Sequence, residues 1–427
     1  MFKVLLNAWK VADIRKRLVY IIIVLLVYRL GDHVLLPGIN LATFLTGTQT
    51  DLNSQANNLF ALIAGGGIGS VFAMGIAPYI NSSIIMQLLT VAIPKLEQIQ
   101  KEGEEGRKKI GQYTRYLAVA LSLLQAAGTV YTYKNQNLFL YNNWLVYIMA
   151  ALGLVTGTIF IMWMGEILTE RGVGNGASFI IFSNILSKLP SSISYFTNYA
   201  VNDIMRWILV AVCLVLFLAV IVFVVLVASG ERRIPVQNSR KMVGRQMYGG
   251  QSSFIPIKVN IAGVMSIIFA ISLLQFPSVI HNIWQNNGIL NWIVGFVNLN
   301  NADNSVNLSG TIIYVVLIFF FTFFYTSFAI NPVEMAENLK KSGGFIPGIR
   351  PGKPTSDYIS KTIERLSWTG GMAYAIIALV PILFQGVFGI HVGFGGTTLL
   401  IVTGVALEFV KQLEAQLLMS HYKGFLA

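Results

Sequence analysis

The sequence contains little charge. Of its 427 residues, 11% are Asp, Glu, Lys or Arg and 55% are hydrophobic, whereas a soluble protein carries about 25% charged residues. The charges are also clustered, which leaves long stretches without any. This composition excludes an ordinary soluble protein and is typical of a chain that crosses a lipid bilayer several times.

The sequence is also poor in the residues that build metal, disulfide and nucleotide sites. Its one cysteine, Cys213, lies in an apolar run, which excludes a disulfide framework and a cysteine-based metal site. The four histidines are scattered, without a second ligand at helical spacing. The glycine-rich stretches GGGIGS, GVGNG and GFGG lack the Lys-Ser/Thr pair of a P-loop, and no G-x-S-x-G motif is present. We therefore expect no cofactor, no metal and no enzyme activity.

Ten apolar segments are long enough to cross a membrane, which takes about 20 mainly apolar residues. The first contains Arg29 and Asp32, which we expect to pair or to lie near an interface. The segments predict an all-α polytopic membrane protein with ten transmembrane helices, at residues 18–36, 71–94, 113–133, 144–165, 176–194, 206–229, 260–280, 310–330, 366–388 and 396–418.

Lysine and arginine predict the orientation of these helices. Of the 30 Lys and Arg residues, 26 lie in the N-terminal segment or in the regions that follow even-numbered helices. Lys134, Lys188 and Arg206 fall on the opposite side. By the positive-inside rule both termini are cytoplasmic. Residues 1–17 carry five basic residues and no cleavage site follows them, so we predict an amphipathic helix on the membrane surface and no signal peptide.

The predicted helices divide into two sets of five with opposite orientation. Helices one to five occupy residues 18–194, helices six to ten occupy residues 206–418, and residues 419–427 form a cytoplasmic tail. An odd number of helices in each half suits an inverted repeat, although the halves share no clear sequence identity.

Two predicted cytoplasmic loops, residues 230–259 and 331–365, are longer than the topology requires. Both contain several Lys or Arg and few acids. Loops of this length without regular structure are usually functional, and basic projections can bind phosphate-rich or acidic partners. The alternative is that these charges only set the topology.

A glycine-rich break precedes the second predicted helix, where residues 59–70 read LFALIAGGGIGS. Each glycine costs about 1 kcal/mol inside a helix. Non-helical backbone at membrane depth is tolerated only inside protein or beside a water-filled cavity. We therefore predict a short half-helix that turns back within a cavity; a helix–loop–helix on the outer surface is the alternative.

Ile76 and Ile80 follow this break and lie four residues apart, on one face of a helix. A hydrophobic constriction can close a pore by dewetting, so the pair is a candidate seal; ordinary core or lipid-facing isoleucines are the alternative. Apart from Arg29 and Asp32 the predicted helix interiors are almost free of charge, which counts against a secondary transporter. A structural scaffold would explain the basic loops but not the glycine-rich break.

Six motifs resemble those of the bacterial SecY family, the channel subunits of the Sec protein translocase. They occur in the family's order and cover nearly the whole chain: MGIAPYINSSIIMQLLT, KEGEEGRKKIGQYTRY, GEILTERGVGNGASFIIF, IPIKVNIAGV, NPVEMAENLKKSGGFIPGIRPGKPT and GGTTLLIV. The resemblance implies a protein of the bacterial cytoplasmic membrane, with two halves around a central hourglass-shaped pore. Unfolded secretory proteins would pass through this pore. Signal sequences and membrane helices would leave into the lipid bilayer through a lateral gate between helices two and three and helices seven and eight.

The resemblance also assigns the parts of the pore. It implies a pore ring at Ile76, Ile80, Ala177, Ile181, Ile268 and Ile401. Ala177 is smaller than the residue usual at its position, so the ring is looser there or the neighbouring Ile180 compensates. A plug at about residues 58–70 would block the external side and move on its glycines; its assigned residues are Leu59, Phe60, Leu62, Ile63, Gly65, Gly66, Gly67 and Gly69.

The two long basic loops would dock the SecA motor ATPase or the ribosome, including its RNA. Arg350, in the sequence GIRPG, matches the main contact arginine of the family, and Arg245 matches a second one. The planar guanidinium suits bidentate bonds to phosphate or carboxylate. The assigned docking residues are Arg350, Arg245, Arg240, Lys340 and Lys341, and the implied partner subunits are SecE and SecG.

Overall fold

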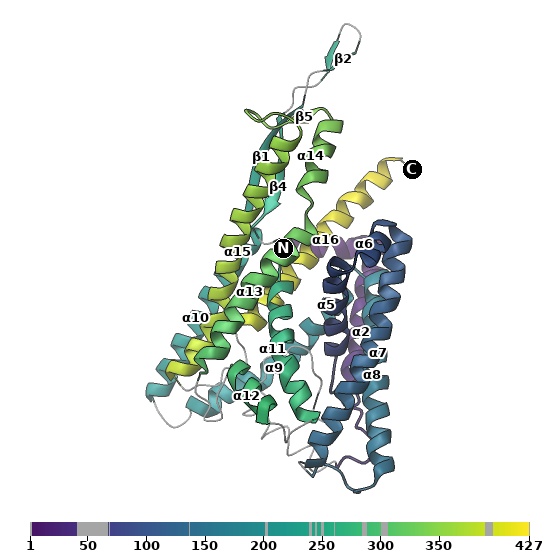
Figure 1. The fold of residues 1–427 in the computed structure, drawn as a ribbon, viewed down its shortest axis with the longest axis vertical. Coiled ribbons are helices and arrows are strands. Elements are labelled where there is room, and N and C mark those ends of the chain that lie inside the picture. The colour runs from purple at the N-terminus through teal and green to yellow at the C-terminus, as the bar shows by residue number, and fades with distance from the viewer. Residues whose placement is uncertain are drawn as a thin grey trace.

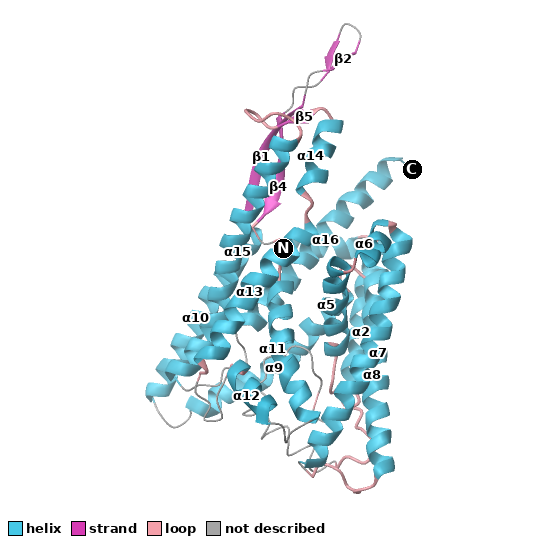
Figure 2. Cartoon of the chain, in the orientation of Figure 1, coloured by secondary structure: helices cyan, strands magenta, loops and turns pink. Residues whose placement is uncertain are grey.

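The structure is a computed structural model that describes residues 2–40, 67, 69–135, 137–200, 204–238, 241–243, 246–248, 252–259, 261–283, 288–299, 306–388 and 396–426. Most of the described chain is helical, and a smaller part with β-strands projects from one end (Figures 1 and 2). Of the predicted plug, only the C-terminal end is described, and the docking residues Arg240 and Arg245 lie outside the described residues.

Each of the ten predicted spans falls on one helix. These helices are α2 (Ala12–Gly31), α5 (Ala77–Ala92), α7 (Glu104–Asn135), α8 (Trp144–Arg171), α9 (Gly176–Ala200), α10 (Ile204–Ser229), α11 (Met265–Ile283), α13 (Leu308–Ala329), α15 (Lys353–Phe388) and α16 (Gly396–Leu426). By length and apolar composition alone, three helical segments of the described chain could each cross a membrane: Trp144–Arg171, Arg206–Ser229 and Leu308–Lys341.

Within the described residues, four shorter helices accompany them: α1 (Phe2–Lys10), α6 (Pro94–Lys101), α12 (Gly288–Val297) and α14 (Pro332–Lys341). Asparagine side chains cap the starts of α8, α13 and α14 by accepting hydrogen bonds from backbone N–H groups of the first turn. The N-terminal segment predicted as one amphipathic helix, residues 1–17, is divided between α1, which packs against α2 and α16, and the start of α2.

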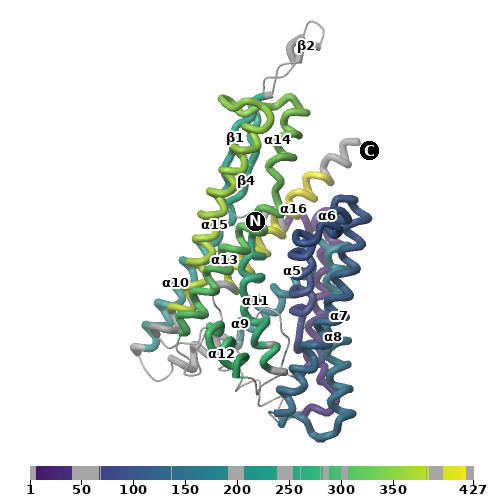
Figure 3. The backbone as a smooth tube through the Cα atoms, in the orientation of Figure 1, coloured from purple at the N-terminus to yellow at the C-terminus, as the bar shows by residue number. Residues whose placement is uncertain are grey.

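The helices form two groups (Figures 1 and 3). Helices α2, α5, α7 and α8 pack together in one group, and α10, α13 and α15 in the other. Helices α9, α11 and α16 lie between the groups: α9 contacts α8 and α16, and α11 contacts α5, α7 and α13. The largest buried apolar cluster takes side chains from both groups, including Ile161 of α8 and Tyr374 of α15. The two halves of the chain therefore share one core.

The prediction that residues 230–259 lack regular structure is wrong. Strand β1 (Glu231–Asn238) pairs in antiparallel fashion with β4 (Ser252–Lys258), and β2 (Lys241–Val243) pairs with β3 (Gln246–Tyr248). The reason lies in alternation along β1, where Ile234 and Val236 are buried and the residues between and after them are exposed. The segment is therefore a β-ribbon that projects from the helices, as Figure 2 shows.

The second long loop, residues 331–365, is also ordered. It contains α14, strand β5 (Gly344–Phe345) and the start of α15, which begins at Lys353, before the predicted span. Strand β5 pairs with β1, so the sheet order is β4-β1-β5 and the two loops form one structure. A small separate core joins them: Ile234, Ile257, Ile346, Ile359 and Ile363. The all-α fold class therefore holds for the membrane part but not for this projection.

Candidate functional site

The six predicted ring positions lie on four elements that meet in the middle of the molecule. Ile76 is the N-cap residue of α5, and Ile80 follows one turn later. The helix begins after Ile76 because Gly75 has a positive φ of 55° and Pro78 lies in the first turn. Five of the six side chains are buried in the one large apolar cluster: Ile76, Ile80, Ile181, Ile268 and Ile401.

Ala177, the sixth position, is partly buried and packs against the same cluster. Gly176 allows α9 to approach α8 closely here, because a Cβ on Gly176 would lie 2.0 Å from the carbonyl oxygen of Gly165. A Cβ placed on Gly165 would lie 3.6 Å from Cδ1 of Ile76 and 3.5 Å from Cδ1 of Ile180. Ile180 has no exposed surface, and it lies beside both Ile76 and the backbone of Ala177.

A cavity of about 480 Å³ opens on one side of these isoleucines. Ile181, Ile268 and Ile401 contribute to its wall. Its other lining residues come from α9 and the residue before it, from α10, α11, α13 and α16, and from the chain around the end of β4, and its charged members are Lys258, Glu408 and Lys411. The cavity therefore combines an apolar surface at the isoleucines with charged side chains elsewhere on its wall.

One face of α16 contributes both apolar and charged residues to the cavity wall. Ile401, Gly404, Glu408 and Ala415 all line the cavity and recur at the three- to four-residue spacing of one helix face. Glu408 lies two turns, roughly 10 Å, beyond Ile401 along the helix. Sequence reasoning missed Glu408 as a cavity residue, although its spacing of seven from the predicted Ile401 could have placed it there.

The predicted lateral gate is the contact between α11 and the pair α5 and α7. Helix α11 packs against both of these helices and, on its other side, against α13. Phe269 of α11 contacts Phe321 of α13 edge to face, with ring centroids 5.6 Å apart. The predicted gate surfaces therefore lie in direct contact.

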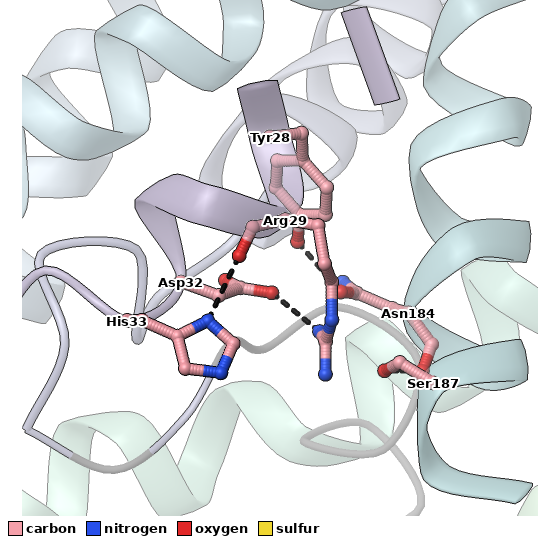
Figure 4. A network of polar contacts seen from close by, with 6 residues as sticks. All are labelled: Tyr28, Arg29, Asp32, His33, Asn184 and Ser187. Carbon is pink, nitrogen blue, oxygen red and sulfur yellow. Dashed lines mark hydrogen bonds and ion pairs between the residues drawn. The ribbon is translucent and has the colours of Figure 1, made fainter. Parts of the chain in front are cut away.

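A polar network lies at the C-terminal end of α2 (Figure 4). Nη1 of Arg29 lies 2.6 Å from Oδ2 of Asp32, which confirms the expected pairing of these residues. Tyr28 donates its hydroxyl hydrogen to Oδ1 of Asn184 on α9 over 2.6 Å, and both residues are buried. Nδ1 of His33 lies 3.0 Å from the carbonyl oxygen of Arg29. The network fixes the end of α2 against α9.

The described docking residues are exposed on the projection, below the β2–β3 pair that forms its tip in Figure 1. Lys340 and Lys341 end α14, and Arg350 lies in the turn between β5 and α15. Gly348 and Gly352 on either side of Arg350 have positive φ values of 81° and 105°, a conformation that glycine adopts without strain. The carbonyl of Arg350 also accepts a hydrogen bond of 2.9 Å from the hydroxyl of Thr355. The turn and this hydrogen bond fix the backbone of Arg350 just before α15, and its side chain is exposed.

Of the predicted plug residues, only Gly67 and Gly69 belong to the described chain. The other six lie outside it: Leu59, Phe60, Leu62, Ile63, Gly65 and Gly66. Gly69 has a positive φ of 77° and is hydrogen-bonded through both its N–H and its carbonyl. Within the described residues there is no group of three or more His, Cys, Asp or Glu that could hold a metal ion.

The chain is similar to known proteins over nearly its whole length. A family model described as SecY matches residues 70–410. A protein translocase subunit SecY from Streptomyces coelicolor is 41% identical over 438 residues, which cover 98% of each chain. A solved protein-conducting channel superposes with a TM-score of 0.62 at 18% identity, over 93% of this chain and 91% of that one. Sec61 from a canine ribosome–channel complex superposes with a TM-score of 0.58 at 16% identity, over 93% and 91%.

Proposed function

This chain belongs to the SecY family, and on that premise we propose that it is the central protein-conducting channel subunit of a Sec translocase. It is a translocase subunit of the membrane and not an enzyme, because that is the character of the family. This membership also decides against a secondary transporter. The channel passes unfolded secretory proteins across the membrane and releases membrane helices sideways into lipid.

The observation that carries the proposal is the set of buried isoleucines beside an open cavity. The four elements that contribute them come from both halves of the chain, and Ile181, Ile268 and Ile401 also reach the cavity wall. A translocating chain presents every type of side chain, so a polar constriction would bind some of them and stall. Isoleucines bind none strongly, yet they pack around a chain and exclude water and ions.

The two halves, residues 18–194 and 206–418, act as the two sides of this pore. The contact of α11 with α5 and α7 is the lateral gate in its closed position. Residues 58–70 are the plug on the external side, which displaces when a chain enters. The described part of this segment, Gly67 and Gly69 to Ser70, leads directly into the ring residues of α5.

The driving energy comes from partners at the projection. Arg350, Lys340 and Lys341 are exposed there, and Arg245 and Arg240, which lie outside the described residues, belong to the basic segment 230–259 of the sequence. This basic surface docks SecA or the ribosome and its RNA, and a solved ribosome-bound channel of the same fold supports the ribosome as a partner. SecE and SecG complete the channel. Signal sequences and nascent chains are its substrates.

The excess of Lys and Arg on one side supports the orientation. Both termini and the projection face the cytoplasm, and the membrane is the bacterial cytoplasmic membrane. The Arg29–Asp32 pair then lies toward the external face.

Reconstitution tests this function. Vesicles that contain the chain with SecE and SecG are expected to import a secretory precursor when SecA and ATP are added, so that the precursor becomes protected from added protease. Vesicles without the chain are the control. Equal protection with and without the chain would contradict the proposed function.

A further inference from the structure

A short antiparallel pairing ties the chain after α2 to the chain before α5. Leu35 and Ser70 form an isolated bridge. Two backbone hydrogen bonds flank it, from Leu36 N to Gly69 O at 2.9 Å and from Val71 N to Val34 O at 2.8 Å. In this pattern the bridging residues are a non-hydrogen-bonded pair, whose Cα atoms lie about 4.5 Å apart. Residues 69–71 are therefore held by backbone pairing on one side.

Tyr133, near the C-terminal end of α7, holds the same residues from a second side. The backbone N–H of Gly69 donates a buried hydrogen bond of 3.2 Å to the hydroxyl oxygen of Tyr133. The tyrosine is 7% exposed and belongs to a separate apolar cluster with Leu36 and Leu154 of α8. The side chain is thus fixed by packing, and its hydroxyl reaches the backbone at the end of the predicted plug.

Helix α8 provides the third contact. A Cβ on Gly157 would lie 2.1 Å from the carbonyl oxygen of Val71, so the backbone there rests directly on the helix. The ring of Phe72 stacks between Tyr28 and Phe160, with centroid separations of 5.8 and 6.0 Å. These contacts leave residues 69–72 no room to shift without breaking the packing of α2, α7 and α8.

The chain on the other flank of the plug is also fixed. Two backbone hydrogen bonds join it to the loop between α7 and α8. The N–H of Leu140 donates to the carbonyl of Gly38 over 2.8 Å, and the N–H of Asn40 donates to the carbonyl of Leu138 over 3.1 Å. Ile39 pairs with Phe139 in a second isolated bridge. Both ends of the chain between Asn40 and Gly67 are therefore attached to the same helix pair.

We propose that Tyr133 is a positioning residue that fixes the base of the plug, residues 69–72, against α7 and α8. The base stays in place while the channel works, and any displacement of the plug pivots before Gly69. Gly69 is then part of the anchor. This inference rests on the proposed function, because it takes residues 58–70 to be the plug.

Tyr133→Phe removes only the hydroxyl and keeps the ring in its apolar cluster. Because the hydrogen bond from the Gly69 N–H is lost, we expect the ion leak of reconstituted vesicles without a translocating chain to rise about 2- to 10-fold. Tyr131→Phe is the matched control, since Tyr131 lies on the same helix and is 42% exposed; its leak is expected to stay unchanged. A leak through Tyr133→Phe equal to that of the control would overturn the role of the hydroxyl.

A disulfide between Leu35→Cys and Ser70→Cys tests whether the base moves. The short Cα separation of a non-hydrogen-bonded pair suits a disulfide, and the native Cys213 is first replaced by Ala. We expect the bond to form in the resting channel and the oxidised protein to translocate within twofold of the reduced one. The opposite result would be a loss of translocation on oxidation that reductant reverses and that neither single-cysteine variant shows. This result would show that the base has to move. Failure of the bond to form would contradict the pairing itself.

Deletion of residues 60–66 separates this inference from the proposed plug. If the deletion raises the leak and Tyr133→Phe does not, the assignment of the plug is supported and the assignment of Tyr133 as its anchor is wrong. If the deletion leaves the leak unchanged, the proposed plug is wrong, and the disulfide result still decides whether residues 69–72 stay in place.

Discussion

Shortening Ile401 should open the seal in measurable steps. Ile401 is 1% exposed, belongs to the shared core and lines the cavity together with Ile181 and Ile268. The proposed function requires the ring to part when the channel opens, so on that proposal the apolar contacts of Ile401 favour the closed state. Removing carbon atoms from this side chain therefore shifts the equilibrium toward open, leaking channels.

The size of the shift follows from the number of carbon atoms removed. Each buried methylene contributes about 0.8 kcal/mol, so Ile401→Val costs the closed state about 0.8 kcal/mol and Ile401→Ala about 2.4 kcal/mol. At 1.4 kcal/mol for each factor of ten, the leak should rise about 4-fold for valine and about 50-fold for alanine. Repacking of neighbouring side chains into the space would lower both values.

The assay is the dissipation of a potassium diffusion potential across vesicles that contain the purified channel. Leu218→Ala on α10 is the matched control, because Leu218 is 55% exposed on the surface of the helices and loses three carbon atoms in the same way. The control leak is expected to equal that of the unaltered protein. If Ile401→Ala leaks no more than Leu218→Ala, the account of an apolar seal is refuted.

Three further predictions concern the docking surface, the plug and the end of α2. Arg350→Glu should abolish SecA-driven translocation of a precursor into vesicles without changing the melting temperature of the protein. Lys361→Glu makes an equal charge change at an exposed residue of α15, and this control should translocate the precursor normally. Normal translocation by Arg350→Glu would contradict the docking role. Deletion of residues 60–66 should raise the leak in the same potassium assay, and an unchanged leak would contradict the plug. Tyr28→Phe leaves Asn184 Oδ1 without its buried donor, so stability should fall by about 1–3 kcal/mol; an unchanged melting temperature in detergent would contradict that contact.

The helices were predictable from the sequence because lipid imposes a simple requirement. A spanning segment needs about 20 apolar residues, and each of the ten predicted spans falls on one helix. The starts and ends were not predictable from hydropathy. Helix α5 begins only at Ala77, where Gly75 and Pro78 set the backbone, and α15 begins at Lys353, because its first turns pack in the small core of the projection.

The β-structured projection was missed because its strands are short and polar. Only Ile234, Val236 and Ile257 are buried on β1 and β4, and their partners come from the second loop, about 100 residues away along the chain. Single-sequence reasoning sees local alternation but not which segment covers it. High basic charge also made these residues look like solvent-exposed loops.

The site was predicted in part. The resemblance placed Ile76, Ile80, Ile181, Ile268 and Ile401, and all five lie in one buried cluster. The residues that surround them depend on how the helices pack. Gly176 lets α9 approach α8 closely, with Ile180 and Ile76 both near Gly165, and residues of α10, α11 and α13 line the cavity together with Glu408 of α16. These neighbours follow from tertiary contacts that no sequence motif records.

Crosslinking to a chain stalled during translocation tests the central claim most directly. A cysteine is placed at Ile401 or, as control, at Leu218, in protein whose Cys213 is replaced by Ala, and the stalled precursor carries one cysteine of its own. A disulfide to the precursor is expected at position 401, only when SecA and ATP have driven the chain into the channel, and none is expected at position 218. Equal crosslinking at both positions, or none at 401, would contradict the proposal that the chain passes through the isoleucine ring.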